Sequence, residues 1–244
     1  MPISFFVHSN ELTTWPLNDT GIDWCVNASG SQLGCPVGGF PGQDGEYGLD
    51  ATHNDNTDGQ AGFSYTKISN SGNELPASAP LGSGPNDWGC TRDNITGLIW
   101  EVKTKDGGLR HMGWRYTWYN PDAAFNGGSA GKANFSNKCF TPPNNCDTHS
   151  FVADVNANGL CGANDWRLPN RFELESLINN DRVSPAIDIN YFPNTPPADL
   201  FWSSSPHAQE PNYARSVEIG VGGVYGGGIY KYYANYVRLV RGGQ

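Results

Sequence analysis

The sequence has few basic residues for its size. Among 244 residues, 15 are Lys or Arg and 24 are Asp or Glu, which gives a formal net charge of −9 and a pI near 4.9. Binding to phosphate backbones or anionic lipids needs an excess of positive charge. The sequence also has no apolar run that approaches the roughly 18 residues of a membrane-spanning helix. We therefore expect no nucleic-acid partner and no membrane insertion.

The sequence also lacks the usual signs of a metal or phosphate site. It contains no phosphate-binding loop, its histidines are scattered, and no two cysteines form a C-x-x-C pair, which argues against zinc. Only 16% of the residues are charged, and Gly and Pro are frequent, as in a loop-rich globular protein. These absences favour a binding protein over an enzyme.

Six cysteines indicate the compartment in which the protein works. Six allow about 15 disulfide pairings, of which we expect two local pairs closed by short loops and one long-range pair. The expected disulfides are Cys25–Cys35, Cys139–Cys146 and Cys90–Cys161. Disulfides persist in oxidising compartments, so we expect a protein of the cell surface or a secreted one. Six reduced, buried thiols in a cytosolic protein are the alternative.

Two helices are expected in the second half of the chain. Residues 148–158 carry an apolar face that begins after an Asp147 cap and ends at an Asn-Gly stop signal. Residues 170–179 carry a second apolar stripe, and Asn170 and Glu173 have the spacing of a capping box. Few helices followed by many short strands predict an α+β fold with small antiparallel sheets and long loops.

The first part of the chain differs from the rest in composition. Residues 1–62 are rich in Gly, Asp and Asn and show little periodicity, which predicts loops and short strands. Residues 63–68 then alternate like a half-buried strand, and residues 96–103 resemble a more buried one. We predict a loop-rich N-terminal extension, residues 1–62, packed on a main domain of residues 63–244.

The C-terminal region contains a segment whose composition suits recognition. Tyrosines and small residues fill positions 225–235, between apolar-patterned frames at 201–205 and 236–241. Tyr offers large, stiff contact area, and Gly and Asn offer adaptable hydrogen bonding. Because strand side chains alternate between faces, we expect one exposed patch, with glycines 226–228 in a turn; a Gly-rich hairpin with exposed tyrosines is the alternative. The expected ligand-binding residues are Arg215, Glu218, Tyr225, Ile229, Tyr230, Tyr232, Tyr233 and Asn235.

A series of motifs, in order along the chain, resembles one known family. The motifs are DNITGLIWEVK at 93–103, NGLCGANDWRLP at 158–169, PAID at 185–188, YFPN at 191–194, FWSSS at 201–205 and YVRLVRG at 236–242. From about residue 60 to 242, the chain resembles the C-terminal domain of the Lcl collagen-like adhesins. Variable proteins of diversity-generating retroelements often carry this same domain.

The resemblance implies a C-type-lectin-like fold with a ligand face near the C-terminus, in a protein of bacterial, phage or viral origin. This fold is shared with formylglycine-generating oxidases, so fold alone does not give function. In retroelement proteins, changes at adenines turn Asn codons into codons for Tyr, Gly, Ser, Ile, Ala, Val or Asp. Residues 225–230 and 232–235 are reachable in this way, whereas Lys231 is not. Adhesin relatives that bind sulfated glycans need basic surfaces, so we do not expect that ligand for this acidic chain.

One stretch has the spacing of a calcium-binding loop. Asp154, Asn156, Asn158 and Asp165 supply hard oxygen atoms at suitable intervals. The same residues also end the expected helix, where Asn-Gly is a stop signal. We expect a helix end without a metal and no cofactor; a structural calcium ion is the alternative.

Together these features predict a non-catalytic ligand-binding protein, a surface receptor or adhesin with a hypervariable C-terminal face. Its partner would be a protein or glycan on another cell or particle surface. An oxidase of the formylglycine-generating type would need a reactive cysteine pair near the C-terminus, and no cysteine follows Cys161. A structural extracellular module is another alternative, with the tyrosine face packed against a partner subunit, and a homo-oligomer remains open. Trp166 and Trp202 lie in the family-like frame and should be buried.

Overall fold

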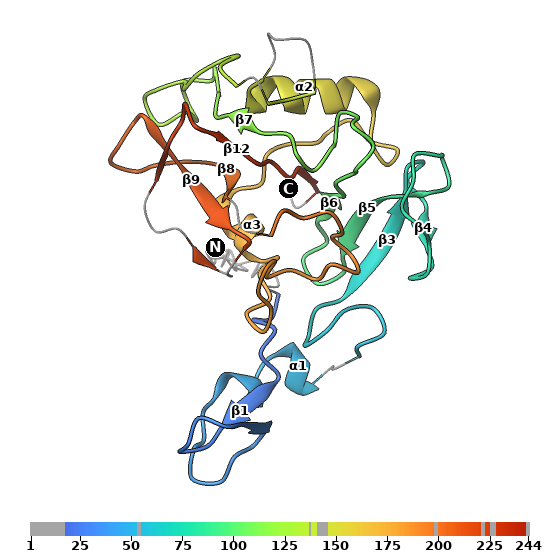
Figure 1. Ribbon diagram of the computed structural model, residues 1–244, viewed down its shortest axis with the longest axis vertical. Coiled ribbons are helices and arrows are strands. Elements are labelled where there is room, and N and C mark those ends of the chain that lie inside the picture. Colours follow the sequence, from blue (N-terminus) through green and yellow to red (C-terminus); the bar gives the residue numbers. More distant parts are fainter. Residues whose placement is uncertain are drawn as a thin grey trace, which may run out of the picture.

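The computed structural model describes residues 18–52, 55–136, 138–140, 146–197, 200–220, 223–224 and 228–242. In these ranges the chain is a mixed α+β protein with small antiparallel sheets and few helices (Figure 1). The helices are η1 (Asp44–Glu46), α1 (Leu49–Thr52), α2 (Thr148–Asn158) and α3 (Arg171–Glu175). The strands are β1 (Trp24–Val26), β2 (Gln32–Gly34), β3 (Tyr65–Ser69), β4 (Glu74–Leu75), β5 (Trp88–Asp93), β6 (Ile99–Glu101), β7 (Tyr116–Thr117), β8 (Leu200–Pro206), β9 (Tyr213–Glu218), β10 (Gly223–Val224), β11 (Ile229–Tyr230), β12 (Ala234–Asn235) and β13 (Val240–Arg241). Within the described ranges, no helix has the length and apolarity needed to cross a bilayer.

A five-stranded sheet has the order β13-β6-β5-β3-β4, and each neighbouring pair is antiparallel. The turn between β5 and β6 depends on Asp93, whose Oδ1 accepts hydrogen bonds from the backbone N–H groups of Ile95 and Thr96. Gly97 follows at φ 73°, a left-handed conformation that glycine adopts without steric cost. The turn chemistry of this motif therefore joins the two central strands.

A second sheet is built around β9, which pairs with β8 along one edge and with β10 and then β11 along the other. β10 and β11 both run antiparallel to β9. The turn expected at glycines 226–228 stays a prediction. Gly226 and Gly227 themselves lie outside the described residues.

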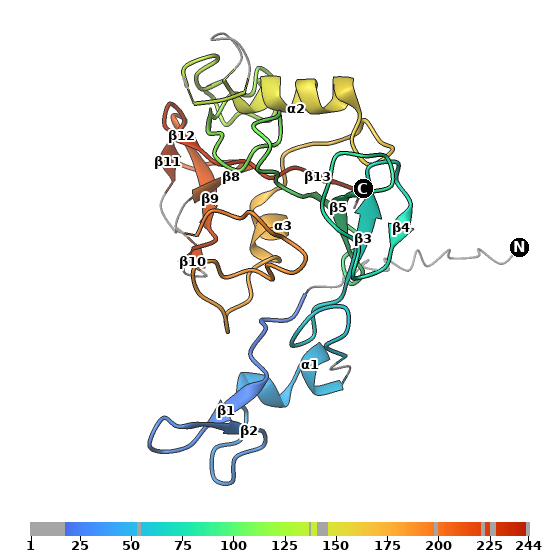
Figure 2. The same ribbon diagram turned by 45° about the vertical axis from the view of Figure 1, so that its right-hand side comes forward.

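The helices begin where the sequence indicated. Asp147 caps α2 by accepting a hydrogen bond from the Ser150 N–H, and Asn170 and Glu173 form the capping box of α3. α3 is shorter than expected, because it ends at Glu175. In Figure 2, α3 lies between the five-stranded sheet and the sheet built around β9.

The hydrophobic core lies between these elements and contains both framework tryptophans. Trp166 and Trp202 are buried, as expected. The indole of Trp202 donates a hydrogen bond to the carbonyl of Tyr116 (2.9 Å), and that of Trp166 donates to the carbonyl of Leu160 (3.0 Å). Each tryptophan therefore fills apolar volume and also satisfies a buried carbonyl group.

The N-terminal part, with β1, β2 and α1, lies at the opposite end of the molecule from α2 (Figures 1 and 2). Hydrogen bonds connect it to the main body: Asn18 Nδ2 donates to the Ser176 carbonyl (2.9 Å), and the Trp24 indole donates to Asp181 (2.6 Å). The structure contains the three disulfides expected from the sequence, Cys25–Cys35, Cys90–Cys161 and Cys139–Cys146.

Candidate functional site

Four tyrosines form one aromatic surface, which we call the tyrosine patch: the half-buried Tyr213 and the exposed Tyr230, Tyr232 and Tyr233. Tyr213 on β9 and Tyr230 on β11 are direct cross-strand partners, and their ring centroids lie 3.9 Å apart. The rings of Tyr230 and Tyr232 lie 5.1 Å apart, and those of Tyr232 and Tyr233 lie 4.6 Å apart. Tyr233 is 52% exposed. The patch is therefore a continuous group of contacting rings open to solvent.

The alternation of β11 and the turn after it set the direction of each side chain. Ile229 packs against the core, so its strand neighbour Tyr230 points outward. The Tyr233 N–H then donates to the Tyr230 carbonyl (2.9 Å), which closes a turn that exposes Tyr232 and Tyr233. Lys231, inside the same turn, is buried.

Lys231 anchors this turn from beneath. Its ammonium donates hydrogen bonds to the backbone carbonyls of Asn126 (2.8 Å), Ser129 (2.7 Å) and Pro211 (2.7 Å). It also lies 4.2 Å from the centroid of the Trp118 ring, within the range of a cation–π contact. Burial lowers the pKa of Lys231 to about 8. The segment with the exposed tyrosines is therefore fixed to two other segments of the chain.

Hydrogen bonds between phenol groups favour the uncharged form of Tyr213 and Tyr232. A side-chain hydrogen bond with Tyr230 raises the pKa of Tyr213 to about 12, and one with Tyr233 raises the pKa of Tyr232. An uncharged phenol both donates and accepts hydrogen bonds. The patch therefore offers aromatic faces and hydrogen-bonding groups without a formal charge of its own.

The structure brings together some of the residues expected to bind ligand. Tyr230, Tyr232 and Tyr233 lie in the patch, as described above. Arg215 is half-buried on β9, two residues after Tyr213 and thus on the same strand face by alternation. Tyr225 lies outside the described residues.

Three other expected residues lie away from the patch. Glu218 is at the far end of β9, about 17 Å from Tyr213 at ~3.3 Å per residue, and alternation places it on the opposite face. Ile229 points to the core. Asn235 is half-buried on β12, where it pairs with Tyr116 of β7. The sequence showed the composition of residues 225–235, but it did not show that β11 and β12 of this segment belong to different sheets.

Sequence reasoning did not include Tyr213, which contributes the closest ring contact of the patch. It precedes the 225–235 segment, and only the strand register Tyr230↔Tyr213 brings the two together. The alternation of β9, in which Tyr213 and Arg215 share a face, was the one available signal.

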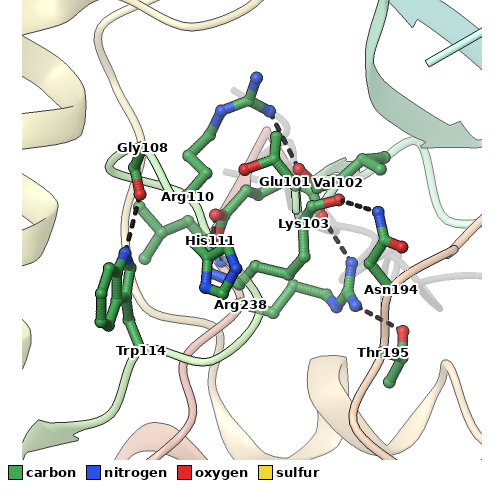
Figure 3. Close-up of polar contacts among 12 residues, drawn as sticks. Glu101, Val102, Lys103, Gly108, Arg110, His111, Trp114, Asn194, Thr195 and Arg238 are labelled. Atoms are coloured by element: carbon green, nitrogen blue, oxygen red, sulfur yellow. Dashed lines mark hydrogen bonds and ion pairs between the residues drawn. The ribbon is translucent and has the colours of Figure 1, made fainter. Parts of the chain in front are cut away.

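A buried charge network fixes the chain directly after this segment (Figure 3). Glu101 accepts from the Lys103 ammonium (2.7 Å) and from the Leu239 N–H (2.9 Å). The Arg238 guanidinium donates to the Glu101 carbonyl (2.6 Å) and to the Thr195 hydroxyl (2.8 Å). Burial lowers the pKa of Lys103 to about 8, although the nearby Glu101 acts in the opposite direction. The network joins the C-terminal frame to β6, an interior strand of the five-stranded sheet.

Two sequence motifs typical of metal binding and of hydrolases have side chains that bond to other residues of the chain. In the calcium-like stretch, the Asn156 side chain exchanges two hydrogen bonds with the Trp166 backbone, and Asp165 pairs with Arg241 (2.6 Å). Within the described residues, no group of three or more His, Cys, Asp or Glu side chains is placed to hold a metal ion. Residues 127–131 have the G-x-S-x-G spacing of a hydrolase nucleophile, but Ser129 lies in a loop and its hydroxyl bonds to Asn212 (3.1 Å).

These features define a disulfide-stapled α+β module with an aromatic surface near its C-terminus. Residues 89–241 match the family model described as the Lcl C-terminal domain. The match covers more than half of the chain, and the protein belongs to this family. Neither the curated proteins nor the solved structures contain a match. Membership identifies an adhesin-like surface module, and the three disulfides are consistent with an extracellular or cell-surface location.

Proposed function

We propose that the protein is a non-catalytic surface receptor or adhesin that captures a ligand with its tyrosine patch. The observation that carries this proposal is a patch of contacting, exposed tyrosines held in place by the buried Lys231. Tyrosines with few rotatable bonds present contact area at low entropic cost, and aromatic side chains dominate binding energy in interfaces. The ligand is a protein or glycan on another cell or particle, and no cofactor takes part.

We further propose that the segment is hypervariable and that the protein is a variable protein of a diversity-generating retroelement, with a C-type-lectin-like fold. Adenine-directed changes of Asn codons reach every residue of 225–235 except Lys231. Lys231 is also the residue of the described turn that binds three backbone carbonyls. Its neighbours Tyr230, Tyr232 and Tyr233 are instead exposed to solvent. The one residue of the segment that an Asn codon does not reach is thus also the one that anchors the turn.

The cysteines support the absence of oxidase chemistry. All six form disulfides within the described chain, and none follows Cys161. The cysteines of the chain therefore supply no free thiol pair for oxidase chemistry, which supports the non-catalytic proposal.

Two display libraries test the proposal. In the first, Tyr230, Tyr232 and Tyr233 are randomised with Lys231 kept; in the second, Lys231 is randomised and the tyrosines are kept. We expect most members of the first library to fold, measured by resistance to protease, and selection to yield binders against unrelated proteins. We expect few members of the second to fold. A first library that rarely folds would show that the tyrosines are structural.

Measuring the oligomeric state distinguishes a patch that captures a ligand from a patch that packs against another subunit. We expect the wild-type protein and a Tyr230→Ser, Tyr232→Ser, Tyr233→Ser variant to have the same mass by analytical ultracentrifugation. A wild-type oligomer that dissociates in the triple variant would assign the patch to subunit contact and contradict ligand capture.

A further inference from the structure

A pocket of about 680 Å³ opens next to the tyrosine patch. It lies between the segment that follows β7, the first turns of α2 and the end of β8. Pro206, one of its lining residues, pairs with Ala214 in the sheet, and the next residue, His207, donates its N–H to the Tyr213 carbonyl (3.0 Å). The pocket and the patch therefore border each other but are formed by different side chains. Its volume lies within the range typical of small-molecule sites, about 300–1,000 Å³.

The walls of the pocket are mainly apolar and aromatic. Trp118, Tyr119 and Phe125 line it, with Val152 and Leu168. Phe125 is 68% exposed, although burying a phenylalanine side chain would contribute about 1.5–3 kcal/mol. The rings of Tyr119 and His149 meet edge to face at 6.0 Å. Flat apolar faces such as that of Phe125 suit a ligand that has a flat apolar face of its own.

The polar groups of the pocket include both donors and acceptors. Asn120 uses its Oδ1 to accept from the Asp122 N–H (2.9 Å), which leaves its amide N–H₂ group as a donor toward a ligand. Asp122 uses Oδ1 to accept from the Ala124 N–H (2.9 Å), which leaves Oδ2 as an acceptor. The hydroxyl of Ser204 and the exposed imidazole of His149 both donate and accept. A ligand with hydroxyl groups, each both donor and acceptor, matches this mixture.

The charges of the pocket disfavour an anion. Arg167 is the one Lys or Arg that lines it in the described part of the chain. Its guanidinium already donates to both carboxylate oxygens of Glu173 (2.7 and 2.8 Å) and to the Gly242 carbonyl (3.0 Å). Asp122 adds a negative charge. A sulfate or carboxylate would therefore meet repulsion without a free cation to offset it.

We propose that this pocket binds an uncharged sugar. A pyranose ring has C–H groups on its faces and hydroxyls around its edge. The C–H face would stack on Phe125, and the hydroxyls would bond to Asn120, Asp122, His149 and Ser204. The site is separate from the tyrosine patch, and it does not depend on the proposed capture function.

Saturation-transfer NMR and titration with free sugars test the proposal. The probes are D-glucose, D-galactose, D-mannose and N-acetyl-D-glucosamine, with glucuronic and galacturonic acids as charged counterparts. We expect saturable binding of at least one uncharged sugar, with Kd on the order of 1 mM, and at least tenfold weaker binding of its uronic acid. Phe125→Ala and Asp122→Asn should each weaken binding at least fivefold. Both side chains are exposed, so both variants should keep the wild-type melting temperature.

Tyr232→Ser is the matched control, because it removes an aromatic ring from the patch and leaves the pocket intact. It should leave sugar binding unchanged. The proposal is overturned if no uncharged sugar binds saturably, if the uronic acid binds equally well, or if Phe125→Ala has no effect. Equal weakening by Tyr232→Ser and Phe125→Ala would place the sugar on the patch and also overturn it. Failure of the capture proposal would instead appear in the libraries and leave these titrations unaffected.

Discussion

Adjacent residues of the tyrosine segment should respond in opposite ways to substitution. Lys231→Met keeps the length and most of the volume of the side chain but removes the ammonium group. Three hydrogen bonds to backbone carbonyls are lost, each worth about 1.5–3 kcal/mol when the donor is charged. Burying an ammonium group has an opposing cost, which the variant no longer bears. We expect a net loss of about 3 kcal/mol in the free energy of unfolding.

Tyr232→Ser removes two ring contacts, with Tyr230 and Tyr233, from a side chain that is 39% exposed. Exposed aromatic pairs contribute about 0.5 kcal/mol each, so the loss should stay near or below about 1 kcal/mol. In a chain of this length, the two variants should differ in Tm by roughly 4–8 °C.

Urea unfolding with the disulfides intact measures both free energies, and equal slopes in the two variants would show that they unfold to comparable states. Equal destabilisation would refute the division into anchor and surface. A Lys231→Met variant as stable as wild type would show that the three carbonyl contacts do not hold the turn.

Three further experiments test the buried framework of the protein. Trp202→Ala should cost about 3–5 kcal/mol in urea unfolding because the indole is fully buried, and a wild-type curve would contradict its core position. Glu101→Gln should cost about 3 kcal/mol by leaving the buried Lys103 ammonium unpaired, whereas Glu74→Gln, in an exposed ion pair, should cost less than about 1 kcal/mol. Burial lowers the pKa of Lys103 and Lys231 to about 8. Between pH 8 and the ordinary value near ~10.4, the unfolded chain binds protons that the native state has released, so these two groups contribute stability that rises with pH. NMR titration of lysine Nζ groups checks this, and ordinary titration of both would contradict it.

Local signals in the sequence were sufficient for the helix starts and for the short-range disulfides. α2 has the expected bounds because its cap, apolar face and stop signal all lie within the helix and its flanks. The second helix ends early because the backbone tightens after Glu175: the N–H groups of Leu177 and Ile178 donate three residues back, to the carbonyls of Leu174 (3.4 Å) and Glu175 (3.0 Å). Leu177 and Ile178 are buried as predicted, but the Asn179 N–H donates to the Ala186 carbonyl (3.1 Å) across the following loop. That partner is not readable from helical periodicity.

The candidate site was predictable in composition but not in arrangement. The tyrosine content of 225–235 indicated an exposed surface, and three of its tyrosines lie there. Tyr213 was missed because strand register decides which rings meet. The burial of Lys231 depends on carbonyls about a hundred residues earlier in the chain, at Asn126 and Ser129. No sequence pattern places a lysine beneath an exposed patch, since lysine is usually a surface residue.

Deep sequencing of the coding segment for residues 212–235, in a culture grown from one cell of the source organism, tests the central claim most directly. We predict that substitutions gather at the codons of exposed residues, including Tyr230, Tyr232 and Tyr233, and occur at positions that are adenine in a nearby template copy. Lysine codons also begin with two adenines, so substitutions at Lys231 should arise as well, but they should be depleted among cells that display folded protein because the anchor is lost. Variation no higher than in flanking sequence, or equal variation at Lys231 among cells that display folded protein, would contradict a hypervariable face held by a fixed anchor.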